Sequence, residues 1–181
     1  MRNLALLRIV APVALLLSPW TALAQSTSLA LSSNTAAAGA TVSLNLSLSS
    51  PSGTSVAGLE WTLTFPGTVS NLSVAAGPSL TAADKTLTCA TTSVGYTCLA
   101  SGMNAIASAN GVVATVSATV SGWAAINIGV SGAIAASPGG SSVSVSATGG
   151  TVTVLSSPPT ISSLTCNPAS LGSGAAATCA L

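Results

Sequence analysis

The chain has very few charged residues and no histidine. Only 3% of its 181 residues are Asp, Glu, Lys or Arg, against roughly 25% in an average soluble protein. The bases are Arg2, Arg8 and Lys85, and the acids are Glu60 and Asp84. A nucleic-acid-binding protein needs several Lys or Arg side chains to displace phosphate counterions. The composition therefore excludes nucleic acid as a partner, and it excludes a basic patch for anionic membranes.

The same scarcity argues against catalysis. Acid–base catalysis needs a positioned titratable group. Glu60 is expected on an outward strand position, far in sequence from Asp84, so a glycosidase pair is not favoured. Asp84 and Lys85 adjoin each other in a predicted loop and are expected to be solvated; no motif supports a Ser–Lys dyad on Lys85. Two scattered acids are also too few for a calcium site. We predict a non-enzyme with no catalytic residue, metal or cofactor.

Long apolar runs are also absent after residue 24, where no run approaches the roughly 20 residues of a spanning helix. Residues 1–24 have the layout of a signal peptide, with early Arg residues, an apolar stretch and a small-x-small end at Ala22-Leu23-Ala24. An uncleaved anchor helix is the alternative, and Pro12 and Pro19 argue against it. Cleavage would leave Gln25, which is not the Cys of a lipoprotein. We predict a secreted, extracellular or cell-surface protein with no membrane insertion after cleavage.

The dominant positive signal is period-two alternation of apolar and polar residues, interrupted about every ten residues by Gly, Pro, Ser or Asn. The clearest segments are 42–49, 59–65 and 112–120. This pattern predicts an all-β domain over residues 25–155, a jelly-roll or immunoglobulin-like β-sandwich of about nine strands. The Ala-rich stretches 35–40 and 75–83 contain Gly or Pro and are interpreted as connections.

Aromatic residues make up only 3% of the chain. Trp61 and Phe65 lie on the apolar side of their strand, with Leu59 and Leu63, and are predicted to be core residues. Trp123 and Tyr96 are the only candidates for stacking on a carbohydrate, which requires exposed rings. We expect both to be partly buried at strand ends instead.

The four cysteines are expected to form two local disulfides, since export permits them. Cys89 and Cys98 flank a predicted hairpin turn at Ser93 and Val94, which favours a cross-strand bridge with Cα atoms about 4.4–6.8 Å apart. Cys166 and Cys179 form the second expected pair. A zinc site needs closer Cys or His spacing, and a catalytic thiol needs a His.

A linker is predicted at residues 156–160, because Pro158 and Pro159 cannot join a β-ladder. Residues 161–181 contain two short strand-like pieces with a Cys on each. They resemble the first strand pair of a bacterial immunoglobulin-like repeat. The chain is therefore expected to be the front part of a longer modular protein, ending in the truncated start of a second domain.

The order of the segments from residue 28 to residue 155 resembles the cohesin family, receptor modules of bacterial cellulose-degrading scaffolds. The matching pieces are GATVSLNLSL (39–48), VAGLEWTLTF (56–65), NGVVATVSATV (110–120) and GGTVTV (149–154). The resemblance implies a nine-stranded sandwich related to carbohydrate-binding modules. Phe65-Pro66-Gly67 departs from the family's usual Asp-Pro turn, and the Cys89–Cys98 hairpin is not a general family feature.

What the resemblance implies about function is a secreted, non-catalytic binding or scaffolding module for extracellular polysaccharide breakdown. Its partner would be a dockerin-type protein module or a polysaccharide. The candidate binding residues are Glu60, Thr62 and Thr64, which face outward from the sheet that cohesin-like domains use for recognition. The alternative function is a structural spacer of a bacterial surface adhesin; an exposed aromatic or amide cluster would favour binding, and a uniform Ser/Thr/Ala face would favour the spacer.

Overall fold

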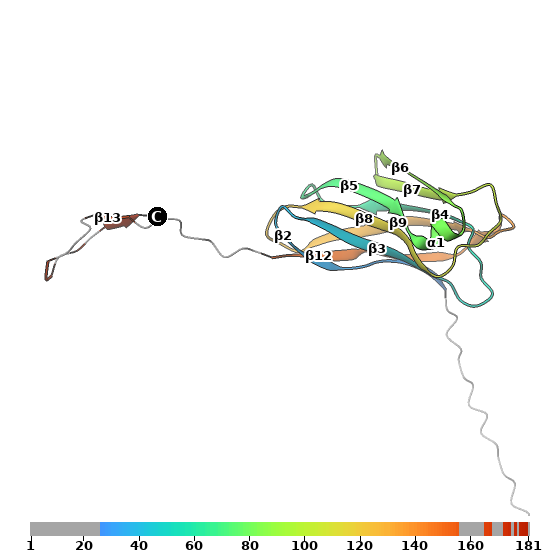
Figure 1. The fold of residues 1–181 in the computed structure, drawn as a ribbon, viewed down its shortest axis with the longest axis horizontal. Helices are drawn as coiled ribbons and strands as arrows, with labels where there is room; N and C mark the ends of the chain where they lie inside the picture. Colours follow the sequence, from blue (N-terminus) through green and yellow to red (C-terminus); the bar gives the residue numbers. More distant parts are fainter. Residues whose placement is uncertain (1–25, 156–164, 168–171, 175, 177, 181) are drawn as a thin grey trace, which may run out of the picture.

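Two β-sheets packed face to face form the main body of the protein (Figure 1). The computed structural model describes residues 26–155, 165–167, 172–174, 176 and 178–180. The first sheet has the strand order β11 (Val145–Thr148), β1 (Thr27–Leu31), β3 (Thr41–Ser49), β8 (Gly111–Val120) and β5 (Val69–Ala76). The second has the order β2 (Asn34–Ala37), β12 (Gly150–Leu155), β9 (Ile126–Ala136), β4 (Gly58–Thr64), β7 (Gly95–Ser101) and β6 (Thr86–Thr92), with β10 (Ser142–Val143) also paired to β9. The predicted β-sandwich is confirmed.

The core lies between the two sheets and is built from the alternating apolar residues. In β3, Val42, Leu44, Leu46 and Leu48 are buried, and the intervening positions are exposed or half-buried. In β4, Leu59, Trp61 and Leu63 are buried, as the alternation predicts. Phe65 is half-buried and packs against the edge of this cluster. Because side chains alternate between faces along a strand, the outward residues of β4 are Glu60, Thr62 and Thr64.

Two stretches that were interpreted as connections contain regular structure. Part of the 35–40 stretch is β2, which pairs in parallel with β12 at the end of the second sheet. Part of the 75–83 stretch is the short helix α1 (Pro78–Ala82), with Pro78 at its first position. A proline is tolerated there because the first N–H of a helix has no partner within the helix. The described residues up to 155 contain twelve strands rather than about nine, since several are only two to four residues long.

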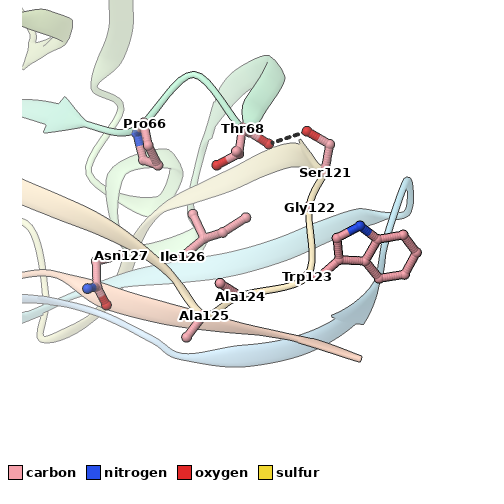
Figure 2. A pocket seen from close by; sticks show the side chains of 9 residues that line it. All are labelled: Pro66, Thr68, Ser121, Gly122, Trp123, Ala124, Ala125, Ile126 and Asn127. Atoms are coloured by element: carbon pink, nitrogen blue, oxygen red, sulfur yellow. Dashed lines mark hydrogen bonds between the residues drawn. The ribbon is translucent and has the colours of Figure 1, made fainter. Parts of the chain in front are cut away.

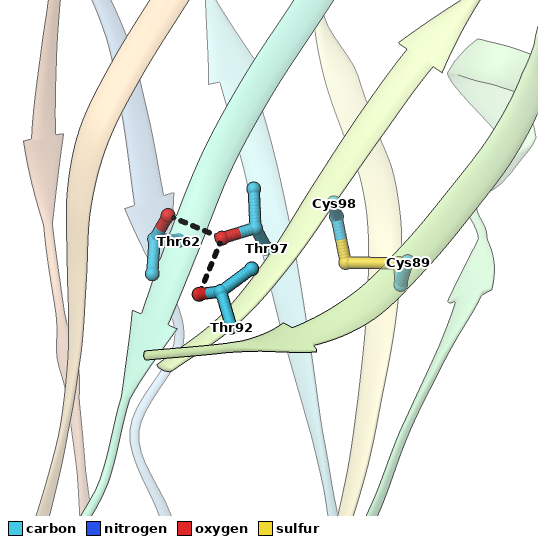
Figure 3. Close-up of a disulfide and its surroundings, with 5 residues drawn as sticks. All are labelled: Thr62, Cys89, Thr92, Thr97 and Cys98. Atoms are coloured by element: carbon cyan, nitrogen blue, oxygen red, sulfur yellow. Dashed lines mark hydrogen bonds between the residues drawn. A yellow bond between two sulfur atoms is a disulfide. The ribbon is translucent and has the colours of Figure 1, made fainter. Parts of the chain in front are cut away.

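Cys89 and Cys98 face each other across the β6–β7 hairpin and form a disulfide (Figure 3). Their Cα atoms are 4.0 Å apart, slightly closer than the expected range. The strands turn at Ser93 and Val94, midway between the two cysteines, as predicted. β6 is the last strand of its sheet and pairs only with β7. The bridge therefore links an edge strand to the rest of the sandwich, and its Cys98 end is buried in the core.

Replacing both Cys89 and Cys98 by Ala is expected to lower the free energy of unfolding by about 2–3 kcal/mol. The closed loop is short, and in the chain-entropy model such a bridge contributes a little under about 3 kcal/mol. Urea denaturation of the full chain measures the change. A reducing agent should destabilise the unmodified chain by a similar amount and leave the double variant almost unchanged. Equal stability of the two chains under oxidising conditions would contradict this role.

The two ends of the chain carry the remaining predictions. The predicted signal peptide, residues 1–24, and the predicted linker, residues 156–160, lie outside the described residues. Beyond the linker, β13 (Thr165–Asn167) and β14 (Thr178–Ala180) pair antiparallel, with Cys166 opposite Cys179 in the backbone register. Whether these two side chains are bonded also lies outside what is described, and the second disulfide and the immunoglobulin-like repeat remain predictions. Among the described residues, no helix is long and apolar enough to cross a membrane.

Candidate functional site

The outward side of strands β9, β4 and β7 carries an exposed apolar pair with a single acid between its members. Glu60 on β4 is the register partner of Leu99 on β7 and of Ile134 on β9. Leu99 is 46% exposed and Ile134 is 58% exposed, although both belong to central strands of the sheet. Large apolar side chains that remain exposed near each other on one surface are a common feature of protein interaction sites.

The bulge in β9 sets this alignment. Between Glu60 and Thr62 the pairing with β9 shifts, so Ile134 lies opposite Glu60 and Ser131 lies opposite Thr62. Gly132 lies within the shifted segment at a φ of +58°, a conformation that favours glycine. A bulge re-aims the side chains around it. The irregularity thereby places Ile134 on the same outward row as Glu60 and Leu99.

A shallow hollow of about 260 Å³ surrounds these residues. It is lined by the start of β4 and the ends of β7 and β9. The lining residues are Gly58, Leu59, Glu60, Leu99, Ala100, Ser101, Ile134, Ala135 and Ala136. The hollow adjoins a second one that shares Gly58, Ser101 and Ala136. Its shape is open and its rim is made of small residues, so it suits a shallow convex part of a protein surface better than a buried small ligand.

A row of hydroxyl groups borders the hollow. Thr62 Oγ1 lies 2.9 Å from Thr97 Oγ1, which in turn lies 3.3 Å from Thr92 Oγ1 (Figure 3). Thr62 is only 8% exposed, so the expectation that it faces solvent freely was wrong. Its position is outward, but Thr97 and Ser131 flank it on the two neighbouring strands. Thr64 is exposed, and Glu60 is half-buried.

We call the six residues of these two rows the Glu60 face: Glu60, Leu99, Ile134, Thr62, Thr97 and Ser131. Sequence reasoning found Glu60 and Thr62 but missed Leu99 and Ile134. The signal for Leu99 was present, since it alternates with the buried Cys98 and Ala100. For Ile134 the bulge breaks the alternation, and a sequence pattern alone does not show a bulge.

The loop beside the hollow is held by Lys85, which was expected to be solvated. Lys85 is 7% exposed, and its Nζ donates hydrogen bonds to the main-chain O of Asn104 at 2.9 Å and to Asn104 Oδ1 at 2.7 Å. Asn104 Nδ2 donates in turn to the main-chain O of Asp84. The prediction of a merely solvated pair was therefore wrong for Lys85, which fixes a loop that exposes Met103 and Ile106.

Tyr96 and Trp123, the two aromatic residues considered as candidates for stacking on a carbohydrate, have different environments. Tyr96 is half-buried, close to the expected partial burial. Trp123 is 70% exposed, so the expectation of partial burial was wrong for this residue. It lies in the β8–β9 loop, whose short residues Gly122, Ala124 and Ala125 offer nothing to cover an indole ring.

The described residues show no group of three or more His, Cys, Asp or Glu side chains that could hold a metal ion. Glu60 stands alone on its face, between two apolar side chains. Its neighbours in the outward rows carry hydroxyl groups that bond one another. The arrangement can bury apolar area against a partner and accept hydrogen bonds from it.

Comparison with known proteins identifies the class. The family model for the cohesin domain matches residues 27–154. No curated protein sequence matches the chain. Since the family match covers most of the chain, the protein belongs to the cohesin family. It is a non-catalytic protein-binding module.

Solved structures share the fold at low sequence identity. The non-cellulosomal cohesin of the archaeon Archaeoglobus fulgidus is 16% identical with a TM-score of 0.62, covering 73% of this chain and 93% of that one. The sixth cohesin of scaffoldin B from Acetivibrio cellulolyticus, solved with a Cel5 dockerin, is 18% identical with a TM-score of 0.64 and coverages of 72% and 100%. A type I cohesin from Clostridium thermocellum, solved as the Coh-OlpA–Doc918 complex, is 12% identical with a TM-score of 0.64 and the same coverages.

Proposed function

We propose that this chain is an extracellular module that binds a dockerin-type protein module through the Glu60 face. The observation that carries the proposal is the exposed pair Leu99 and Ile134 on either side of Glu60, on central strands of the second sheet. The cohesin structures from Acetivibrio cellulolyticus and Clostridium thermocellum were solved with dockerins, which supports a partner of this class.

The chemistry of the face defines the partner. Leu99 and Ile134 would pack against apolar side chains at the centre of the interface, where burial excludes water. Glu60 would accept hydrogen bonds from a Lys or Arg side chain, because it is the only charged group of the face and a buried charge needs a partner. We expect a partner that presents a cationic side chain between apolar ones, on a convex surface such as a helix.

Isothermal titration calorimetry of the full exported chain with the dockerin modules encoded in the same genome tests the proposal. At least one dockerin should bind with a 1:1 stoichiometry and a negative heat-capacity change, the mark of apolar burial. Absence of binding by every dockerin would favour the second function, a structural spacer in a surface protein. The outer side of the first sheet favours that alternative, because its exposed residues on β3 and β5 are almost all Ser, Thr, Asn or Ala.

Secretion is part of the proposed function. We expect the mature protein to begin at Gln25, after removal of residues 1–24 by signal peptidase. Mass spectrometry of the protein from the culture medium measures its N-terminus, and Gln25 could be recovered in its cyclised form. Recovery of intact Met1 in the exported protein would contradict the prediction. The family resemblance implies a role in polysaccharide breakdown. A dockerin partner that is itself attached to a hydrolase would support this role.

A further inference from the structure

Among the described residues, Trp123 is the only aromatic residue that is mostly exposed to solvent. Of the four aromatic residues there, Trp61 is 0% exposed, Phe65 and Tyr96 are half-buried, and Trp123 is 70% exposed. An exposed indole does not contribute the large stabilisation of the folded state that burial of its apolar surface would give. The position therefore calls for an explanation beyond folding.

The loop that carries Trp123 is anchored at its first residue, Ser121. Both the main-chain N–H and the Oγ of Ser121 donate to the main-chain O of Thr68, at 2.8 and 3.1 Å. Gly122 has a φ of +98°, which lets the chain reverse just before Trp123. Figure 2 shows the indole projecting from this loop, clear of the other labelled side chains. The loop is thus anchored at Ser121, two residues before Trp123, and most of the indole surface is accessible.

A hollow of about 450 Å³ lies beside the loop, between the β4–β5 turn and the β8–β9 loop. Besides Trp123, its lining provides the hydroxyl of Thr68 and the amide of Asn127. Asn127 Oδ1 accepts from Thr151 Oγ1 at 2.9 Å, and the structure gives its NH₂ no partner among the described residues. None of the charged residues between 26 and 155, which are Glu60, Asp84 and Lys85, lines the hollow.

We propose that Trp123 and this hollow form a binding site for a neutral polysaccharide. A sugar ring presents a flat set of C–H groups that stacks on an indole. Figure 2 shows Asn127 and Thr68 on the other side of the hollow, so their polar groups would bond to hydroxyls of a neighbouring ring of the same polymer. A charged sugar would find no counter-charge there, so the site takes an uncharged one. Such an open site, with one aromatic platform, suits a segment of a long chain rather than a small enclosed ligand.

The site is separate from the Glu60 face. The hollow around Glu60 uses the start of β4 and the end of β9, at Gly58 and Ala136. The Trp123 hollow uses Pro66, just after β4 ends, and Ile126, where β9 begins. Because β4 and β9 are antiparallel, these are opposite ends of the same strand pair. A dockerin and a polysaccharide could therefore be held at the same time.

Isothermal titration calorimetry of the full exported chain against hydroxyethyl cellulose, glucomannan and arabinoxylan tests the proposal. At least one of these neutral polymers should bind, and polygalacturonate should bind at least about tenfold more weakly. Trp123→Ala should weaken the binding about tenfold, as expected for the loss of a stacked aromatic. Binding should also protect Trp123 from fluorescence quenching by acrylamide, because the only other Trp of the processed chain, Trp61, is buried.

Val94→Ala serves as the matched control, since Val94 is 68% exposed in the β6–β7 turn and lies outside the hollow. It should leave polysaccharide binding unchanged. The proposal is overturned by no binding of any of the three neutral polymers, or by equal binding of Trp123→Ala and the unmodified chain. It is also overturned if polygalacturonate binds as tightly as the neutral polymers, or if Trp123→Ala weakens dockerin binding and leaves polysaccharide binding intact.

Discussion

Replacing Trp61 by Ala is expected to lower the free energy of unfolding by about 3–5 kcal/mol. Trp61 is 0% exposed and lies among the buried residues of both sheets, opposite Cys98 in the ladder. Its truncation would leave a cavity that rigid strands cannot close. Since a domain of this size is stable by only about 5–15 kcal/mol, the variant should be near the limit of folding.

Urea denaturation followed by far-ultraviolet circular dichroism measures the loss, and Trp61→Phe is the matched control. The indole Nε1 of Trp61 has no hydrogen-bond partner among the described residues. A phenyl ring therefore removes volume without breaking a hydrogen bond, and Trp61→Phe should cost clearly less than Trp61→Ala. An unchanged unfolding midpoint for Trp61→Ala would show that this strand does not face the core.

Introducing acids at Leu99 and Ile134 together should weaken dockerin binding by at least about a hundredfold, which is the size of the effect seen at interface hot spots. Leu99→Asp with Ile134→Asp removes the apolar pair and places two further carboxylates beside Glu60. The interface would then bury like charges without partners. Both positions are exposed, so the free energy of unfolding should change little.

Ser43→Asp with Ser49→Asp is the matched control for this variant. Both positions are exposed on β3, in the other sheet, and the replacement adds the same charge. Calorimetric titration of the two double variants with the same dockerin separates a local effect from one of net charge. Loss of binding in both variants would show that net charge is responsible, and unchanged binding in the first would contradict the proposed interface.

The sequence contains enough information to predict the sheets but not their edges. Long alternating runs such as Val42 to Leu48 and Leu59 to Leu63 can bury only one face, so their register follows from polarity alone. The Cys89–Cys98 pair added a second constraint on the β6–β7 hairpin. Short elements such as β2 and α1 carry no such pattern, because their formation depends on neighbours that are distant in sequence.

The proposed binding surface was predictable only in part, because exposure on a sheet depends on neighbouring strands that are distant in sequence. Glu60 was identified from its outward position on β4, whereas the outward position of Ile134 depends on a bulge that the polarity pattern does not reveal. Thr62 is shielded by neighbours on other strands, and Lys85 by a loop nearly twenty residues further along the chain. The exposure of Trp123 depends on the small residues around it, which leave the ring uncovered.

Nuclear magnetic resonance mapping of the surface of this chain that a dockerin contacts tests the central claim most directly. On addition of an unlabelled dockerin to the ¹⁵N-labelled full chain, the largest amide shift changes should cluster at Glu60, Leu99 and Ile134 and at their neighbours in β4, β7 and β9. The amides of β1, β3 and β5 should change little. Changes concentrated on those strands of the first sheet, with β4, β7 and β9 unaffected, would contradict the account.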